Sequence, residues 1–176
     1  MTDPIIVAPV APEEVPVLRD LAEETFLETF SGQNTPDNIS AYVARAFEIG
    51  AVRAEYENAQ SSFHFARSGP DHAGYLKLNT GSAQTEQELE NAMEIERIYA
   101  RRACQGRGVG KRLMATALEA AQAAGVDWIW LGVWEHNQKA IAFYEHQGFV
   151  PFGRHSFRMG DEVQIDIMMK KKIARP

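Results

Sequence analysis

The sequence predicts a mixed α/β fold in one domain that spans residues 1–176. A chain of this length can bury one sizeable core and is too short for two ordinary domains. Strand-like and helix-like patterns follow in the order strand, two helices, three strands, helix, strand, helix and two strands. A glycine-rich loop joins a predicted strand to a predicted helix past the middle of the chain. We therefore expect a mixed α/β domain with an anion site at that loop.

The N-terminal half is expected to hold one strand, two helices and a hairpin. Leu18, Ala22 and Phe26 recur at i, i+4 and i+8, which predicts a helix. Thr35 and Pro36 are typical of a helix start, and Gly50 is expected to close that second helix. The expected ranges are a strand at 5–10, helices at 12–30 and 36–50, strands at 62–67 and 73–79, and a polar, mobile loop at 80–91.

The strand predicted over residues 93–100 has an irregular phase. Strict alternation does not place Ile95 and Ile98 on the same face. A β-bulge between them would restore the phase, and bulges often occur beside active sites. Alternatively, Tyr99 joins Ile95 on an ordinary strand, and the residues alone favour neither arrangement.

The C-terminal half alternates helices and strands and ends in a hairpin. Val109, Leu113 and Ala117 form an apolar stripe on a helix that stops at Gly125. Asn137 is expected to cap the last helix. The expected ranges are a helix at 108–124, a strand at 127–134, a helix from 137 to 148, and hairpin strands at 149–159 and 163–170 around Gly160-Asp161.

Composition excludes several classes of protein. A formal net charge of −6 argues against nucleic-acid binding, which needs a cationic surface. No apolar run approaches the roughly 20 residues of a membrane span, so we expect no membrane partner. Cys104, the single cysteine, cannot form an internal disulfide, and no metal-binding cluster is visible. The N-terminus lacks a basic leader, so we expect a cytoplasmic protein.

The two signs of charge are separated along the chain. Between Arg97 and Leu118 there is no acidic residue, and this cationic segment suits an anion. The segment just before it carries five acidic residues, which suit a cation. The cations are Arg97, Arg101, Arg102, Arg107, Lys111 and Arg112, and the acids are Glu86, Glu88, Glu90, Glu94 and Glu96.

The glycine loop predicts a phosphate site. Its residues are Gln105-Gly106-Arg107-Gly108-Val109-Gly110, followed by Lys111. Glycines after a strand and before a helix expose backbone N–H groups at the positive end of the helix dipole. The spacing does not fit the ATP-binding pattern GxxxxGK[ST] or the dinucleotide pattern GxGxxG. It fits Q/R-x-x-G-x-G/A.

A second pattern accompanies the loop, N-x-x-A-x-x-F-Y-x-x-x-G-F, carried by Asn137, Ala140, Phe143, Tyr144 and Gly148-Phe149. With both patterns, about residues 93–171 resemble the GCN5-related N-acetyltransferase (GNAT) superfamily. The resemblance implies the GNAT fold, with a mixed, mostly antiparallel central sheet flanked by helices, and acetyl-CoA as cosubstrate without a metal. It places the acetyl-CoA-binding core at about residues 93–149, and a homodimer is a family-level expectation. Ala100-Arg101-Arg102 departs from the family, in which many members have a larger aliphatic residue and a proline.

The resemblance also implies roles for residues that would bind acetyl-CoA. The backbone of Ile98, Tyr99 and Ala100 would bind the pantetheine arm. Asn137 shares a helical face with Ala140 and Tyr144, so all three can line one cleft. The pyrophosphate would be held by Gln105, Gly106, Arg107, Gly108, Val109, Gly110 and Lys111.

Three residues are candidates for acid–base catalysis. Tyr144, with an ordinary pKa of about 10, is protonated at neutral pH and could protonate the leaving thiolate; alternatively it is a core tyrosine. Glu94 and Glu96 could accept the proton of the acceptor amine, or could be partners of Arg97 or solvated strand residues. His155 fits a structural, hydrogen-bonded histidine better than a catalyst, and Cys104 has no paired histidine to make it a nucleophile.

The acceptor is a small-molecule amine in our interpretation. Residues 130–135, 152–157, 160–161 and 164–166 resemble bacterial spermidine/spermine N-acetyltransferases, and the acidic segment suits a polyamine. Transfer would then occur by direct attack in a ternary complex. Alternatives are a protein N-terminus or lysine, another small amine, or a non-catalytic acyl-CoA-binding regulatory module.

Overall fold

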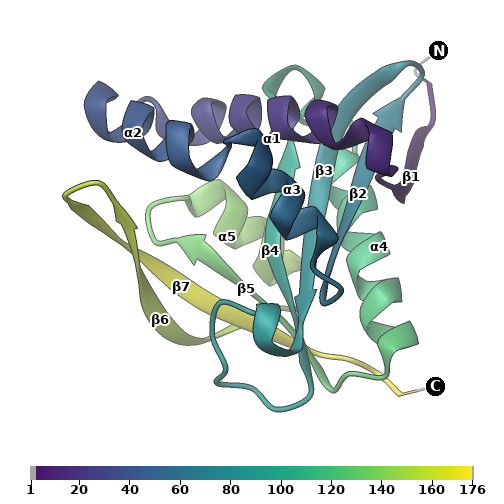
Figure 1. Cartoon of the computed structure of the whole chain (residues 1–176). Helices are drawn as coiled ribbons and strands as arrows, with labels where there is room; N and C mark the ends of the chain where they lie inside the picture. Colours follow the sequence, from purple (N-terminus) through teal and green to yellow (C-terminus); the bar gives the residue numbers. More distant parts are fainter. Residues whose placement is uncertain (1–2, 176) are drawn as a thin grey trace.

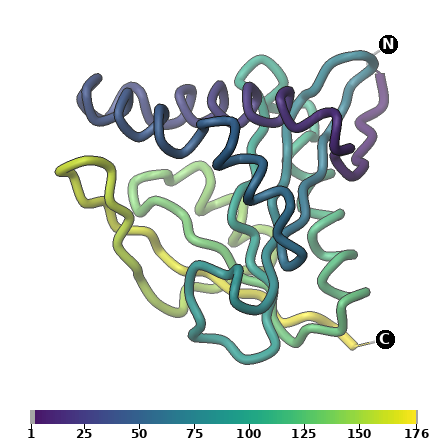
Figure 2. The backbone as a smooth tube through the Cα atoms, in the orientation of Figure 1, coloured from purple at the N-terminus to yellow at the C-terminus, as the bar shows by residue number. Residues whose placement is uncertain are grey.

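The fold is built on one twisted sheet, seen in a computed structural model that describes residues 3–175 (Figures 1 and 2). Its strand order is β1-β2-β3-β4-β5-β7-β6, and the β4–β5 pair is parallel while the other neighbours are antiparallel. The strands are β1 (Ile5–Pro9), β2 (Ser61–Ser68), β3 (Asp71–Thr80), β4 (Ala92–Ala100), β5 (Trp128–Trp134), β6 (Val150–Met159) and β7 (Glu162–Lys172). The predicted mixed α/β class, with a mostly antiparallel sheet, is confirmed.

The helices cover both faces of the sheet. Figure 1 shows α1, α2 and α3 on one face, while α4 and α5 lie on the other. The helices are α1 (Val15–Phe30), α2 (Pro36–Ala46), α3 (Ile49–Glu57), α4 (Val109–Ala124) and α5 (Gln138–His146). Among residues 3–175, none of these helices combines the length and apolar composition that crossing a bilayer requires.

The two largest hydrophobic clusters lie on opposite faces of the sheet. Adjacent residues of β3 divide between them, because successive strand residues point to opposite faces: Tyr75 packs with α1, and Leu76 packs with α4. Both are almost fully buried, at 1% and 0% exposure. Leu113 and Ala117 of α4 are fully buried, which confirms the predicted stripe. β3 and β4 are therefore held rigidly from both sides where they approach the site.

The expectation that Gly50 closes the second helix is wrong. α2 ends at Ala46, and Gly50 lies in the first turn of α3, a helix that we did not expect. The Glu48 side chain caps α3 by accepting a hydrogen bond from the backbone N–H of Ala51 at 3.0 Å. Gly50 has no positive φ, so it lacks the left-handed conformation of a glycine helix terminus.

A β-bulge in β4 is confirmed, and the ordinary-strand alternative is wrong. Lys77 pairs with Arg97 and Leu78 pairs with Ile95, so Glu96 is the extra residue on the bulged strand. Ile95 and Ile98 consequently pack into the same core.

Residues 80–91 were expected as a mobile loop, but Thr80 ends β3 and the rest of the segment is tied to the sheet. After a short 3-10 turn at Gly81–Ala83, Gln84 accepts a hydrogen bond from the Trp130 indole N–H at 2.8 Å. The backbone N–H of Thr85 donates to Glu94 at 2.8 Å. The Gln84–Trp130 contact joins residues 46 apart in the chain, so the polar composition of the segment gave no sign of it.

Candidate active site

The cleft opens where two parallel strands separate. β4 and β5 pair only from Ala92↔Trp128 to Ile95↔Leu131. Beyond this, β4 continues to Ala100 and β5 to Trp134, and the two strands diverge (Figure 1). The last residues of β4 therefore have backbone N–H and C=O groups without a partner on β5. A cleft of about 740 Å³ occupies the opening, and its walls include α1, α5, the glycine loop and β6.

The glycine loop forms one end of the cleft and has the shape of an anion cradle. Gly106 and Gly108 have φ of 75° and 86°, which residues with a Cβ rarely adopt. A methyl group at either position would meet no other part of the protein within 4 Å, so the loop leaves open space for a ligand. The first backbone N–H groups of α4 are free of helical partners, as at every helix start. These features fit the pyrophosphate of coenzyme A.

Within the described part of the chain, only some of the predicted cations lie free around the glycine loop. Arg107, Lys111 and Arg112 are exposed around the loop. Arg101 instead pairs with Glu24 of α1 at 2.9 Å, and Arg102 donates to the backbone carbonyl of Glu28 at 2.6 Å. These two arginines fasten the segment before the loop to α1. Sequence reasoning missed Lys139, which lines the cleft and lies 3.4 Å from the Gln105 side-chain oxygen.

Tyr144 and Asn137 lie on the cleft wall made by α5. Asn137 caps α5 as predicted, with its side-chain oxygen accepting from the Ala140 N–H at 3.2 Å. Tyr144 is 9% exposed, and its ring packs between Phe143 and Phe149. Burial raises the pKa of Tyr144 further above its ordinary value of about 10, so its hydroxyl remains protonated at neutral pH. The site thus presents a neutral proton donor on this wall.

Glu94 of β4 also lines the cleft, and its carboxylate is buried and has polar contacts. It is 3% exposed, and accepts hydrogen bonds from the Thr85 hydroxyl at 2.6 Å and the Asn79 amide at 3.3 Å. Burial raises the pKa of Glu94 and outweighs the hydrogen bonds from Thr85, which lower it. A raised pKa makes a carboxylate a stronger base once it is ionised.

Glu96 differs from Glu94 because cations surround it. It forms ion pairs with Lys77 at 2.5 Å and with Arg97 at 3.6 Å, and accepts from Asn79 at 2.6 Å. Burial alone would raise the pKa of Glu96, but Arg97 and Lys77 reverse the effect and lower it. Arg97 is also bound by both carboxylate oxygens of Glu55, at 2.9 and 3.0 Å. Glu96 is therefore a fixed anion within a charged network.

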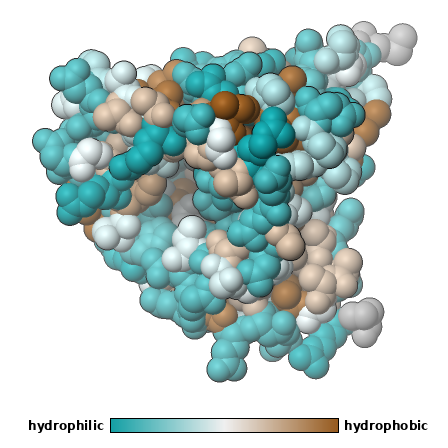
Figure 3. All heavy atoms as spheres, viewed as in Figure 1, coloured by the Kyte–Doolittle hydropathy of each residue, from teal (hydrophilic) through white to brown (hydrophobic). Residues whose placement is uncertain are grey.

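The other end of the cleft is acidic and aromatic. Figure 3 shows the surface hollowed between α1 and α2 on one side and the β6–β7 hairpin on the other. Its lining includes the carboxylates of Glu86 and Asp166, with His155 between them. His155 is hydrogen-bonded, as predicted, and it also faces the cleft. Sequence reasoning did not connect it with Asp166, although a hairpin around Gly160-Asp161 places the two strands side by side.

A parallel strand pair that opens beside a glycine loop, with a tyrosine on the helix that lines the opening, is the arrangement expected of an acyl-CoA-dependent transferase. The model of the acetyltransferase (GNAT) family matches residues 18–149, and the chain belongs to this family. It is an acetyl-CoA-dependent N-acetyltransferase. Within residues 3–175, no group of three or more His, Cys, Asp or Glu side chains could hold a metal ion.

Relatives match along nearly the whole chain. An "uncharacterized N-acetyltransferase in pepI 3'region" of Lactobacillus delbrueckii subsp. lactis is 36% identical over 164 residues, covering 93% of this chain and 95% of that one. The PaiA N-acetyltransferase of Thermoplasma acidophilum, solved with coenzyme A, shares the fold at a TM-score of 0.77 and 20% identity, covering 96% and 99%. The protein yncA of Salmonella typhimurium, solved with its cofactor acetyl-CoA, has a TM-score of 0.72 and 15% identity, covering 98% of this chain and 95% of that one.

Proposed function

We propose that the enzyme transfers the acetyl group of acetyl-CoA to a primary amine of a polyamine such as spermidine or spermine. The observation that carries this proposal is a single cleft with two chemically different ends. The glycine loop and its cations lie at one end, and the carboxylates of Glu86, Glu94 and Asp166 lie toward the other. An anionic cosubstrate and a cationic acceptor can thus enter from opposite sides and meet where β4 and β5 separate. The resemblance of four C-terminal segments to bacterial spermidine/spermine N-acetyltransferases supports the same acceptor.

Backbone groups would make most of the contacts with acetyl-CoA. Ile98, Tyr99 and Ala100 would bind the pantetheine arm through the N–H and C=O groups that β5 leaves without partners. Residues 105–111 would hold the pyrophosphate, and Asn137 would line the cleft beside them. A backbone N–H beside the bulge at Glu96 would stabilise the negative charge that develops on the thioester oxygen.

Tyr144 is the proposed general acid. Its hydroxyl is a proton donor at neutral pH, and the cleft wall that carries it also includes Asn137 and Ala140. A thiol has an ordinary pKa of about 8.5, so the departing thiolate ends mostly protonated at pH 7 and has to receive a proton from water or from a nearby donor. Tyr144 would supply this proton without exposing the thioester to bulk water.

Glu94 is the proposed general base, acting directly or through a water molecule. An alkylammonium with a pKa of about 10.4 is neutral in roughly one molecule in 10³ at pH 7, a penalty of about 4 to 5 kcal/mol. The raised pKa of Glu94 makes it the better proton acceptor of the two glutamates, because Lys77 and Arg97 stabilise the ionised form of Glu96. Glu96 would instead keep Arg97 neutralised beside the acceptor.

One observation favours a small amine over a protein N-terminus or lysine. Asn38 of α2 donates to Asp161 at the hairpin tip at 2.7 Å, and Gln164 donates to Asn34 at 2.9 Å. These contacts join the α1–α2 segment to the β6–β7 hairpin along one side of the acidic and aromatic end of the cleft. Since the cationic acceptor would enter there, we call it the acceptor end. A folded protein would have to separate them, whereas a flexible polyamine need not.

The test is an amine panel with acetyl-CoA, followed by release of the free thiol. We expect turnover on spermidine or spermine, and higher kcat/KM on these than on a lysine-containing peptide. Preference for the peptide would refute the polyamine acceptor. Tight binding of coenzyme A with no turnover on any amine would instead favour a non-catalytic acyl-CoA-binding module.

A further inference from the structure

Three titratable side chains from distant parts of the chain meet at the acceptor end of the cleft. His155 of β6 lies between two carboxylates: its Nδ1 is 3.1 Å from Glu86, and its Nε2 is 3.3 Å from Asp166 of β7. The His155 and Asp166 side chains are 18% and 20% exposed, and that of Glu86 is 37% exposed. The pKa of His155 is raised, mainly by the hydrogen bond to Asp166. The three groups together carry more negative than positive charge.

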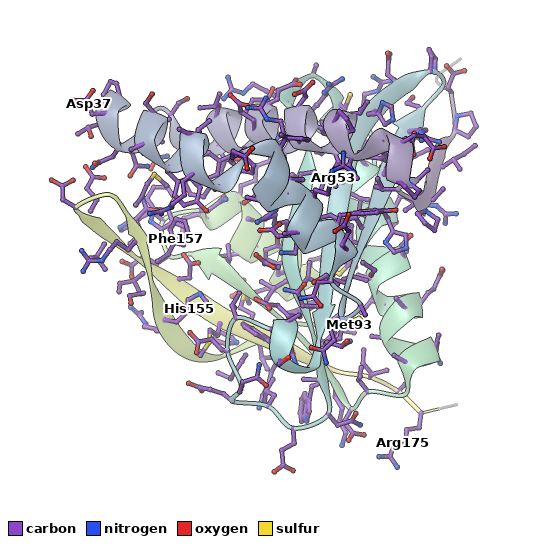
Figure 4. The ribbon with its side chains drawn as sticks, in the orientation of Figure 1. Asp37, Arg53, Met93, His155, Phe157 and Arg175 are labelled. Carbon is purple, nitrogen blue, oxygen red and sulfur yellow. The ribbon has the colours of Figure 1, made fainter. Side chains whose placement is uncertain are left out.

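Aromatic rings lie directly beside these groups on the same side of the sheet. Asp166 of β7 pairs with Trp134 of the neighbouring strand β5, so the two side chains point to the same face of the sheet. Phe157 lies two residues beyond His155 on β6 and therefore faces the same side as His155 (Figure 4). Phe30 of α1 approaches the rings of both Trp134 and Phe157, with centroids 6.5 Å apart in each pair. All of these side chains line the cleft.

Carboxylates beside aromatic faces are a recognised way to bind an alkylammonium ion, because ring faces and carboxylates both attract a cation. The aromatic faces also pack against methylene groups, which carboxylates alone would not do. The cationic side chains of the cleft other than His155 do not neutralise these carboxylates, because they are paired elsewhere or lie at the other end. Arg97 is bound by Glu55 and Glu96, and Lys111 and Lys139 lie at the glycine-loop end.

We propose that Glu86 and Asp166, with the adjacent rings of Trp134 and Phe157, bind a second cationic nitrogen of the acceptor, remote from the amine that is acetylated. His155 holds the two carboxylates in place and offsets part of their charge. This subsite selects a diamine or polyamine over a monoamine of equal length. The inference rests on the proposed function and adds to it a binding site for the second nitrogen of the acceptor.

The experiment compares two acceptors of nearly equal shape, 1,4-diaminobutane and n-pentylamine, in which a methyl group replaces one ammonium group. We expect the wild type to prefer the diamine in kcat/KM. Glu86→Gln and Asp166→Asn should each lower kcat/KM for the diamine about five- to tenfold and change that for n-pentylamine less than about twofold. Glu90→Gln, an exposed residue of the same loop outside the cleft lining, is the matched control and should change neither value.

His155→Gln separates this role from a purely structural one. Glutamine keeps hydrogen-bonding groups but removes the cation, so kcat/KM for the diamine should be maintained or rise while that for n-pentylamine does not. Equal losses on both amines in the Glu86, Asp166 or His155 variants would overturn the subsite. Equal use of both amines by the wild type would overturn it while leaving acetyl transfer to amines intact. Release of no thiol with either amine, or with spermidine, would overturn both proposals.

Discussion

Substitution of Gly108 by alanine tests the assignment of the glycine loop, because its effects on stability and on binding can be calculated separately. Gly108 has a φ of 86° and caps the N-terminus of α4. A residue with a Cβ costs about 1–2 kcal/mol in this left-handed conformation. The added methyl group meets no other part of the protein within 4 Å, so no steric term adds to this cost. For a chain of this size, the melting temperature should fall by about 2–8 °C.

The same methyl group would enter the space that the loop leaves open for the pyrophosphate. We expect the Kd for coenzyme A to rise at least tenfold, which corresponds to about 1.4 kcal/mol. Gly125→Ala is the matched control, because Gly125 has a φ of 69°, equally open surroundings, and caps the other end of α4. It should lower the melting temperature similarly and leave the Kd unchanged.

Isothermal titration with coenzyme A and differential scanning calorimetry measure the two effects. If Gly108→Ala binds coenzyme A as tightly as the wild type, the loop is not the pyrophosphate site. If Gly125→Ala weakens coenzyme A binding as much, both substitutions act through the stability of the whole fold, and the assignment of the loop to the pyrophosphate is refuted.

Three further predictions follow from the titratable groups. Tyr144→Phe should lower kcat about 100-fold or more with an unchanged Kd for coenzyme A, and undiminished turnover would remove Tyr144 as the general acid. A base must be ionised, and burial raises the pKa of Glu94, so the acidic limb of the pH–rate profile should lie above the ordinary range of a glutamate. Glu94→Gln should abolish that limb and Glu96→Gln should retain it; the reverse result would exchange their roles. Asp166 raises the pKa of His155 in the folded state, so the stabilisation by His155 should be complete below about pH 6.5 and lost as pH rises through the raised pKa. Melting temperatures of the wild type and His155→Gln from pH 5.5 to 9 should therefore converge, and a constant difference would show that the His155 proton adds no stability.

The sequence predicted those features that depend on neighbouring residues. Gly125 ends α4 in the left-handed conformation, Asn137 caps α5, and the misplaced phase of Ile95 and Ile98 pointed to the bulge. The wrong expectation that Gly50 ends a helix also has a local explanation. A glycine forms a left-handed helix terminus only when its φ is positive, and that of Gly50 is not. The capping Glu48 before it was the more informative residue.

The acceptor end could not be predicted in the same way, because its contacts join residues far apart in the chain. Glu86 and His155 are 69 residues apart, and no periodicity relates a loop before β4 to the strand β6. Phe30 and Phe157 of the aromatic lining have the same origin, since they come from two elements far apart in the chain. Charge patterning indicated an acidic region but not which acids face the cleft.

Glu94 and Glu96 show why residue type and spacing do not assign a catalytic role. Both are glutamates of one strand, and the side-chain amide of Asn79 donates to both. Their pKa values nevertheless shift in opposite directions, because Lys77 and Arg97 contact Glu96 whereas Glu94 is buried among neutral donors. The bulge contributes to this difference, since Glu96 is the extra residue that breaks the alternation of β4. The environment that the fold gives each carboxylate therefore sets the direction of its pKa shift, and a substitution at Lys77 should shift the pKa of Glu96 upward and narrow the difference between the two.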